Sequence, residues 1–220
     1  MQFRFGTIAP DPEFDPSHGG WRKIRQPGLD WFYLLGAPLA AITAGSLSIA
    51  IAAVGDTSHR IVIRPGDLSF WRVACVVMLA VGGLIALLAV HEGIHLLAHP
   101  GNGRTARSIV GIWPSRGVFY TYYGGEISRN RFVFGTALPF LLLSLGPVTL
   151  FWATGRVYLW LAFVALLNGI GSCFDLLVIV ICLSQVPGRA ILRNHGWDAY
   201  WRPVISEAAE PRGRGGTSGR

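Results

Sequence analysis

The chain has 220 residues, of which 51% are hydrophobic and only 14% are charged, with a formal net charge of +7. Soluble domains average about 25% charged residues, so this composition excludes an ordinary soluble domain and an intrinsically disordered chain. The arginines flank apolar runs, where basic residues set the orientation of membrane spans. Their number therefore does not indicate nucleic-acid binding. We therefore expect an integral membrane protein whose main partner is the lipid bilayer.

The amino-terminal residues 1–28 contain scattered prolines and acidic residues and no apolar core of the signal-peptide type. We expect this segment to stay on the cytoplasmic side and the first apolar run, 31–55, to act as an uncleaved anchor. That run carries no charge over 25 residues. A helix of this length crosses a hydrocarbon core of roughly 30 Å.

A second apolar run, 73–98, is uncharged as far as Val90, then contains a histidine and a glutamate, and stops before Pro100. We expect a second span here, with ionisable groups near its cytoplasmic end. Ionisable side chains are costly inside a bilayer and usually have a functional role there.

The polar loop that follows the second span predicts two short strands, Ser108–Trp113 and Gly117–Tyr123, around Pro114-Ser115-Arg116. Two interpretations of this hairpin remain open. Its alternating aromatic side chains suit the membrane interface, whereas an edge strand close to a catalytic site would bind an extended peptide by strand addition.

Two more apolar runs complete the expected bundle: 132–155 has no charge, and 157–186 is interrupted by Asp175 alone. The final residues, 204–220, are rich in Gly, Arg and Ser and predict a disordered cytoplasmic tail. On one side of a four-span arrangement fall 15 of the 19 basic residues, which places both termini in the cytoplasm. We expect an all-α membrane protein, a bundle of four transmembrane helices over residues 29–203 with a small cytoplasmic β-hairpin between helices 2 and 3.

The second span contains His91-Glu92-Gly93-Ile94-His95, which is an HExxH pattern. On a helix, histidines at positions i and i+4 project from one face at a separation that suits a single zinc ion. Glu92 lies about 100° around the helix, beside the metal, where it can take a proton from water as a general base. The pattern therefore predicts Zn²⁺ as cofactor, His91 and His95 as ligands and Glu92 as the catalytic base.

A catalytic zinc site usually has three protein ligands, so one ligand remains to be found. His99 is the local candidate, but its Cα would lie about 12 Å from that of His91 on a straight helix. Asp175 lies 18 residues beyond Val157, and His91 lies 18 residues beyond Val73. Because both helices run in the same direction, we expect the two residues at one depth in the membrane. We favour Asp175 as the third ligand and keep His99 as the alternative.

Asn168 precedes Asp175 by seven residues, close to two helical turns, and is expected on nearly the same helix face. Two roles are open for its side chain. The amide could stabilise a developing oxyanion as part of the catalytic site. It could instead hydrogen-bond a neighbouring helix, which Gly169 and Gly171 would allow to approach closely.

These features together resemble the putative zincin peptidase family of small bacterial membrane proteins. The resemblance covers residues 73–203 and includes the HExxH helix, the loop with its hairpin, Arg131-Phe132 at the start of the third span and the segment Asn168–Asp175. That family is similar in plan to the site-2 proteases, which pair a membrane HExxH helix with an aspartate on a later helix.

The resemblance implies His91, His95 and Asp175 as metal ligands and Glu92 as the base. It also implies that Asn168 helps to hold a substrate carbonyl. This chain departs from the site-2 proteases in lacking their Asn-Pro and Leu-Asp-Gly patterns.

We expect hydrolysis of peptide bonds near the cytoplasmic face of a bacterial cell membrane, with a membrane-associated polypeptide as substrate. One alternative is a zinc-binding membrane protein without turnover, and another is a small proton- or ion-coupled transporter that uses Glu92 and Asp175. The lack of an internal repeat argues against the transporter. A haem-binding bundle is disfavoured because every intramembrane histidine stands on one helix. The oligomeric state and the identity of the substrate stay open.

Overall fold

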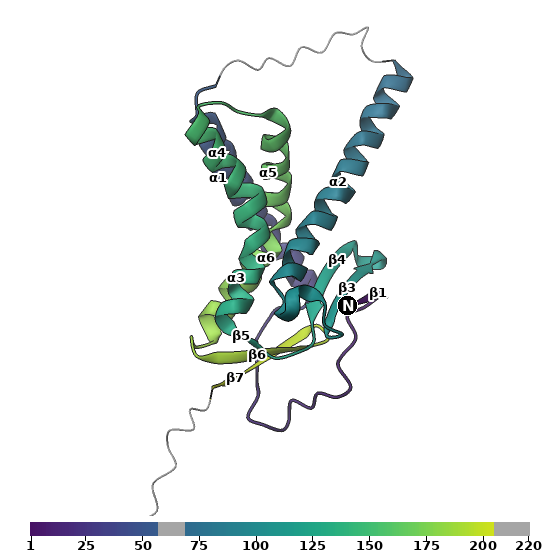
Figure 1. Cartoon of the computed structure of the whole chain (residues 1–220), viewed down its shortest axis with the longest axis vertical. Coiled ribbons are helices and arrows are strands. Elements are labelled where there is room, and N and C mark those ends of the chain that lie inside the picture. The colour runs from purple at the N-terminus through teal and green to yellow at the C-terminus, as the bar shows by residue number, and fades with distance from the viewer. Residues whose placement is uncertain (57–68, 205–220) are drawn as a thin grey trace, which may run out of the picture.

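The computed structural model describes residues 1–56 and 69–204, in which a group of long helices stands on two small β-sheets (Figure 1). The chain is mostly helical, but the expected all-α class is wrong. The sheets include short strands from the amino-terminal and carboxyl-terminal segments. These strands are too short to be recognised as long apolar runs in the sequence. The predicted disordered tail lies outside the described residues, apart from Val204.

Three long helical stretches in the described residues are apolar enough to cross a membrane. Their bounds agree with the expected spans 31–55, 73–98 and 132–155 to within three residues at each end. The third stretch is not uniform, because a π-helical turn separates two α-helical parts. The elements are α1 (Leu29–Ala52), α2 (Phe70–Ala98), and the consecutive α3 (Arg129–Phe140), π-helical turn (Leu141–Leu145) and α4 (Gly146–Thr154).

The fourth expected span, 157–186, is broken into α5 (Leu159–Gly171) and α6 (Cys173–Gln185), which meet at 45° around Ser172. The described residues therefore hold four membrane-crossing elements only if this bent pair counts as one span. The break places Asp175 in the first turn of α6, where the exposed backbone N–H groups of a helix favour a carboxylate.

The first sheet contains the hairpin that the loop sequence predicts, with β3 at Ser108–Trp113 and β4 at Val118–Tyr123. Gly117 closes the turn with a φ of +62°, a conformation that glycine adopts without strain. The amino-terminal strand β1 (Gln2–Phe5), which the sequence analysis did not anticipate, pairs in parallel with β3. The strand order is β1-β3-β4, so β4 is an edge strand.

The second sheet joins the two ends of the chain in the order β2-β7-β6-β5. Its central hairpin turns at Gly196, which has a φ of +62°. Because β2 pairs with β7, the amino-terminal segment and the carboxyl-terminal hairpin lie at the same end of the helices. The strands are β2 (Arg22–Lys23), β5 (Ile127–Ser128), β6 (Ala190–His195) and β7 (Asp198–Pro203).

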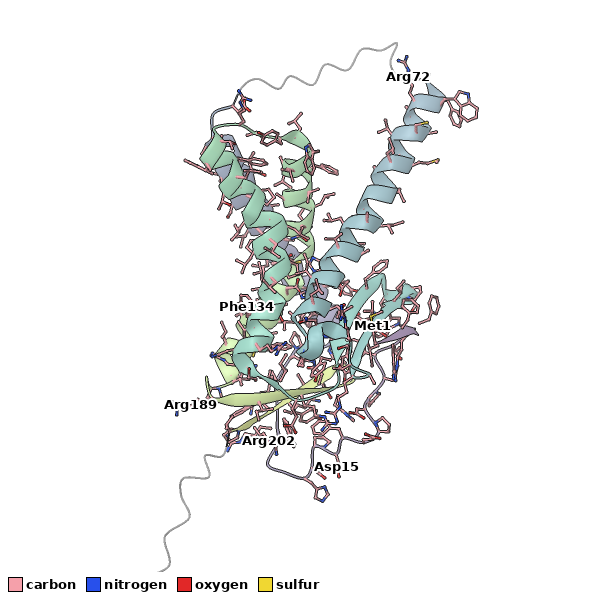
Figure 2. All side chains as sticks on the ribbon, viewed as in Figure 1. Met1, Asp15, Arg72, Phe134, Arg189 and Arg202 are labelled. Atoms are coloured by element: carbon pink, nitrogen blue, oxygen red, sulfur yellow. The ribbon has the colours of Figure 1, made fainter. Side chains whose placement is uncertain are left out.

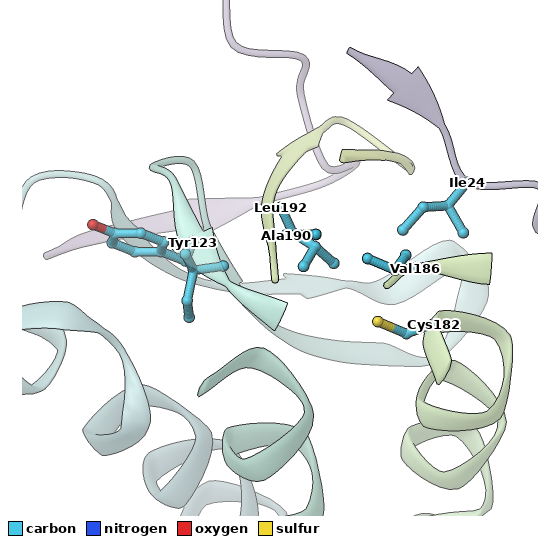
Figure 3. Close-up of a cluster of buried hydrophobic side chains, with 7 residues drawn as sticks. Ile24, Tyr123, Cys182, Val186, Ala190 and Leu192 are labelled. Carbon is cyan, nitrogen blue, oxygen red and sulfur yellow. The ribbon is translucent and has the colours of Figure 1, made fainter. Parts of the chain in front are cut away.

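A buried cluster fixes this second sheet to the helices (Figure 3). Cys182 and Val186 at the end of α6 pack against Ala190 and Leu192 of β6, and Ile24 closes the cluster from the amino-terminal segment. Leu192 is completely buried. The sheets are therefore held firmly against one end of the helices, and the site described below lies at that end.

The molecule has two polar ends and an apolar middle (Figure 2). Arg72 marks the far end of α2, and Arg189 and Arg202 lie at the sheet end. Between the ends, α2 leans away from α1, α4 and α5 (Figure 1). None of the residues in the most apolar part of α2 is buried within the protein. This exposure is expected for a helix that contacts lipid.

Candidate metal centre

Three ligand atoms from two helices meet at one point near the sheet end of α2. His91 and His95 stand one helical turn apart, with their Nε2 atoms 3.2 Å from each other. Asp175, from the first turn of α6, places Oδ2 3.1 Å from His91 Nε2 and Oδ1 3.3 Å from His95 Nε2. One ligand atom from each residue lies within 4.8 Å of the others. His91 and Asp175 therefore lie side by side on two helices, as the equal residue counts along the two apolar runs predict.

His95 is oriented by a backbone carbonyl that a proline leaves free. Its Nδ1 atom lies 3.0 Å from the carbonyl oxygen of Gly135 on α3. In an α-helix this oxygen would accept from the N–H four residues later, but that residue is Pro139, which has no N–H. Gly135 also allows α2 to come close, because a Cβ at this position would lie 2.9 Å from that of Ala98.

His91 is oriented by Asn168, which is almost completely buried. His91 Nδ1 lies 2.8 Å from Asn168 Oδ1. The orientation of the amide is not ambiguous, because its Nδ2 atom donates to the carbonyl oxygen of Pro139 at 3.1 Å, a group that can only accept. Nδ2 also lies 2.9 Å from Ser144 Oγ and 3.3 Å from Ser172 Oγ.

These two contacts fix the tautomer of both rings in their neutral form. The Nδ1 atoms of His91 and His95 both face oxygen acceptors, so each must carry a hydrogen. In the neutral ring the hydrogen is then absent from Nε2, and both Nε2 lone pairs point at the carboxylate of Asp175. Three acceptors that converge without a donor repel one another, and a bound cation relieves that repulsion. The residues present therefore fit a metal ion.

Glu92 supplies a further acceptor next to this group. Its Oε2 atom is buried and has no hydrogen-bond partner among the described residues. Its backbone carbonyl is held separately, because Thr121 Oγ1 of β4 donates to it at 3.1 Å. An unpartnered buried carboxylate oxygen is costly for a fold, so packing alone does not explain the position of this group.

A cavity of about 280 Å³ connects the cluster of His91, His95 and Asp175 with the sheets. Glu92, His95 and Asp175 line it from the helices, and Tyr122 and Tyr123 of β4 line it from the first sheet. Further lining residues from the second sheet and its turn are Asn194, Gly196, Trp197 and Ala199. Residues of both sheets therefore line the site on the side opposite the helices.

The structure shows where His99 and Asn168 lie, the two residues whose roles were undecided from the sequence. His99 lines the cavity but lies outside the group of three ligand atoms, and its Nδ1 atom is buried without a hydrogen-bond partner. Asn168 contacts His91 from behind and does not line the cavity. The bend at Ser172 separates Asn168 from the face that carries Asp175. The geometry therefore favours a positioning role for Asn168 over the oxyanion role.

Comparison with known proteins supports the family resemblance on which the sequence analysis drew. Residues 84–191 match a family model described as a putative zincin peptidase. This segment is therefore similar to the putative zincin peptidase family. No curated protein and no solved structure matches the chain.

The matched segment contains His91, His95 and Asp175 and both residues that orient the two histidines. It begins at Leu84, within α2, and ends at Ile191, at the start of β6. The amino-terminal strands β1 and β2 and the strand β7 lie outside it. The matched segment thus holds the whole candidate centre, whereas part of the covering sheets comes from the flanking segments.

Two supports of the site were not predicted from the sequence. Arg131 donates from Nε to the carbonyl of Ala98 and from Nη2 to that of His99, both at 3.0 Å, and so closes the carboxyl end of α2. The Gly135 carbonyl holds His95. The spacing of Gly135 and Pro139 could have indicated this contact. Proline has no N–H, so the carbonyl four residues before it in a helix lacks its usual α-helical donor.

Proposed function

We propose that this protein is a membrane-embedded zinc metallopeptidase that hydrolyses peptide bonds of membrane-associated polypeptides near the cytoplasmic face of a bacterial cell membrane. The observation that carries the proposal is the meeting of His91 Nε2, His95 Nε2 and the Asp175 carboxylate within 4.8 Å, with Glu92 lining the same cavity. Two imidazoles and one carboxylate form the ligand set of a catalytic zinc site with one position left open.

Zinc, when bound, supplies Lewis-acid chemistry, because it lowers the pKa of water and polarises a carbonyl group. His91, His95 and Asp175 would hold the ion, and Asn168 and Gly135 would keep the two rings in the required tautomer. This arrangement needs no movement of the helices, since the ligand atoms already converge.

Glu92 would act as the proton carrier. Its buried Oε2 atom has no partner to compete for a proton, so it can take one from the attacking water and return it to the leaving amine. A zinc site with a purely structural role has no need of such a group. The unpartnered carboxylate therefore favours a hydrolase over a zinc-binding protein without turnover.

The open edge of β4 would bind the substrate. Gly124 donates its N–H to the carbonyl of Arg107, and the register then directs the N–H and C=O groups of Phe119 and Thr121 away from β3. Both residues line the cavity. An extended peptide that pairs with this edge would have its backbone exposed to attack, whereas a helical substrate would hide its peptide bonds.

The distribution of charge supports the cytoplasmic placement of the site. Among the described residues, most basic side chains lie at the sheet end, in the amino-terminal segment, the loop between α2 and α3 and the chain after α6. Basic residues close to membrane spans favour the cytoplasmic side. Of the four basic residues expected on the other side, Arg60 and Arg64 lie outside the described residues.

The test is elemental analysis of zinc in detergent-purified protein, combined with cleavage of a quenched fluorescent library of extended peptides. We expect about one zinc per chain in the wild type, loss of zinc in Asp175→Asn, and retention of zinc without cleavage in Glu92→Gln. The last variant is the matched control, because it changes one carboxylate in the cavity to an amide and leaves the ligand set intact.

Three results would contradict the proposal. A wild type that binds no zinc under any loading condition would favour the proton- or ion-coupled transporter. Full zinc retention by Asp175→Asn would remove Asp175 from the ligand set. Zinc binding with no cleavage of any peptide, in lipid nanodiscs as well as in detergent, would favour the zinc-binding protein without turnover.

A further inference from the structure

The first sheet has one covered face and one bare face. On the covered face, Tyr120 and Tyr122 are each 7% exposed, and the Tyr120 hydroxyl donates to the carbonyl of Gly6 at 3.3 Å. On the opposite face, Phe3 and Phe5 of β1 are 64% and 78% exposed. Neighbouring side chains along a strand point to opposite faces of a sheet, so the covered face and the bare face alternate along the same strands.

The bare face is apolar across all three strands. The register places Phe5, Ile112 and Phe119 in one row across β1, β3 and β4, and Phe3, Val110 and Thr121 in the next row. Phe119 is 37% exposed, and nothing among the described residues packs over Phe3 or Phe5 closely enough to bury them. We call the five apolar side chains of these two rows the aromatic face: Phe3, Phe5, Val110, Ile112 and Phe119.

The sheet lies at the level of the apolar helices. Thr121, on the same side of the sheet as the aromatic face, donates to the carbonyl of Glu92, six residues before the last residue of α2. At about 1.5 Å per residue, this contact is about 9 Å inside the end of the helix. The turn of the hairpin is held at the first turns of α1, where the Tyr33 hydroxyl donates to the carbonyl of Arg116 at 2.8 Å.

The charges around the sheet fit a membrane surface. Arg116 forms an exposed ion pair with Asp30 at 2.8 Å beside the Tyr33 contact, in the position where polar head groups would begin. Arg4 lies on the face opposite to Phe3 and Phe5. The apolar surface of α2 continues down to Leu97, which is 63% exposed, so α2 and the aromatic face both present apolar side chains near this end of the molecule.

We propose that the first sheet docks on the cytoplasmic leaflet and that its aromatic face is immersed among the lipid chains next to the head groups. The partner is the bilayer itself, and β1, outside the segment matched by the family model, contributes the two most exposed side chains. Aromatic side chains are favourable in this layer. Docking would hold the open edge of β4 at the membrane surface, where a membrane-associated polypeptide emerges. The inference depends on the membrane placement in the proposed function but not on hydrolysis.

The test uses single cysteine variants of the full chain, labelled with an environment-sensitive fluorophore and reconstituted in nanodiscs of phosphatidylcholine and phosphatidylglycerol. The background carries Cys75→Ala, because Cys75 is exposed whereas Cys173 and Cys182 are buried. Two quenchers are compared: a nitroxide on the lipid chain and iodide in the water. Gln2→Cys is the matched control for Phe3→Cys, since the adjacent residue lies on the opposite face of the same strand.

We expect strong quenching by the lipid nitroxide and little by iodide for Phe3→Cys and Phe5→Cys, with the reverse for Gln2→Cys. Equal iodide quenching of Phe3→Cys and Gln2→Cys would overturn the proposal. Protection of Phe3→Cys from both quenchers would also overturn it, because a protein surface such as a second copy of the chain would then cover this face.

A label in the middle of α2, at Val81→Cys, separates the two ways in which the experiment can fail. Quenching of this label by the lipid nitroxide shows that the helix is in the bilayer, so failure at Phe3→Cys then concerns the sheet alone. If Val81→Cys is not quenched, both the docking of the sheet and the membrane embedding in the proposed function are wrong.

Discussion

Asn168 Oδ1 accepts a hydrogen bond from His91 Nδ1 at 2.8 Å, on the opposite edge of the ring from the one that faces Asp175. Asn168 and Asp175 are only seven residues apart, and an unbroken helix would place them on one face. The bend at Ser172 lets the two residues hold His91 from both sides. One ring is thereby fixed in position and in tautomer by a single broken helix.

We predict that Asn168→Ala weakens zinc binding about 10- to 100-fold, the usual cost of removing an outer partner of a histidine ligand. The physical reason is that His91 loses the acceptor that keeps its hydrogen on Nδ1. Competition with a chromophoric chelator measures the affinity. Ser184→Ala is the control, because Ser184 is an exposed residue of α6 that bonds only within its own helix. Equal affinities in the two variants would show that Asn168 does not support the metal.

We predict that Arg131→Lys lowers the free energy of unfolding by about 1.5 to 3 kcal/mol, the range for hydrogen bonds to a charged group. Lysine keeps the charge but cannot reach the carbonyls of Ala98 and His99 together, as the guanidinium does. The last carbonyls of a helix have no partner within it. Thermal unfolding in detergent measures the effect, and the exposed Arg104→Lys should leave it unchanged. A similar loss of stability in both variants would show that the two hydrogen bonds from Arg131 do not stabilise the end of α2.

We predict that Tyr122 makes the stability of the chain depend on alkaline pH. Burial raises the pKa of Tyr122 to about 12, above the ordinary value of about 10. The folded state therefore holds this proton more tightly, and its contribution is complete below pH 10 and is lost as the pH rises toward 12. Between pH 8 and 11 the loss is about 1.4 kcal/mol. Tyr122→Phe removes this loss, which unfolding curves at both pH values would measure.

The comparison of the wild type with Tyr122→Phe isolates the effect of this hydroxyl, because all other titrating groups are the same in the two proteins. Tyr122→Phe should also be less stable at pH 8, since the hydroxyl donates to the carbonyl of Asn194 at 2.8 Å and so joins the two sheets over the cavity. Identical slopes of stability against pH would contradict the burial of this hydroxyl.

We predict that Phe119→Pro raises the KM for an extended peptide roughly two- to tenfold, the value of one lost hydrogen bond. The N–H of Phe119 points away from β3, so proline removes a donor at the open edge and no bond of the sheet. Phe119→Leu is the control, because it changes the side chain and keeps the N–H. Zinc content and thermal stability should be the same in both. If proline and leucine give the same KM, the substrate does not pair with β4.

The amino-acid sequence alone determined the long apolar helices, the HExxH pair and the hairpin. Each of these depends on a local periodicity or on the absence of charge over many residues, so neighbours along the chain are sufficient to show it. The equal depth of His91 and Asp175 could also be predicted, because helix rise converts a residue count into a distance.

Only the tertiary structure decided how the site is supported and covered. The bend at Ser172, the amide of Asn168 behind His91 and the carbonyl of Gly135 beside His95 depend on contacts between helices that are far apart in sequence. The second sheet joins residues near position 22 to residues near position 201. Its strands are short and partly polar, so their stability comes from pairing with distant segments and not from their own composition.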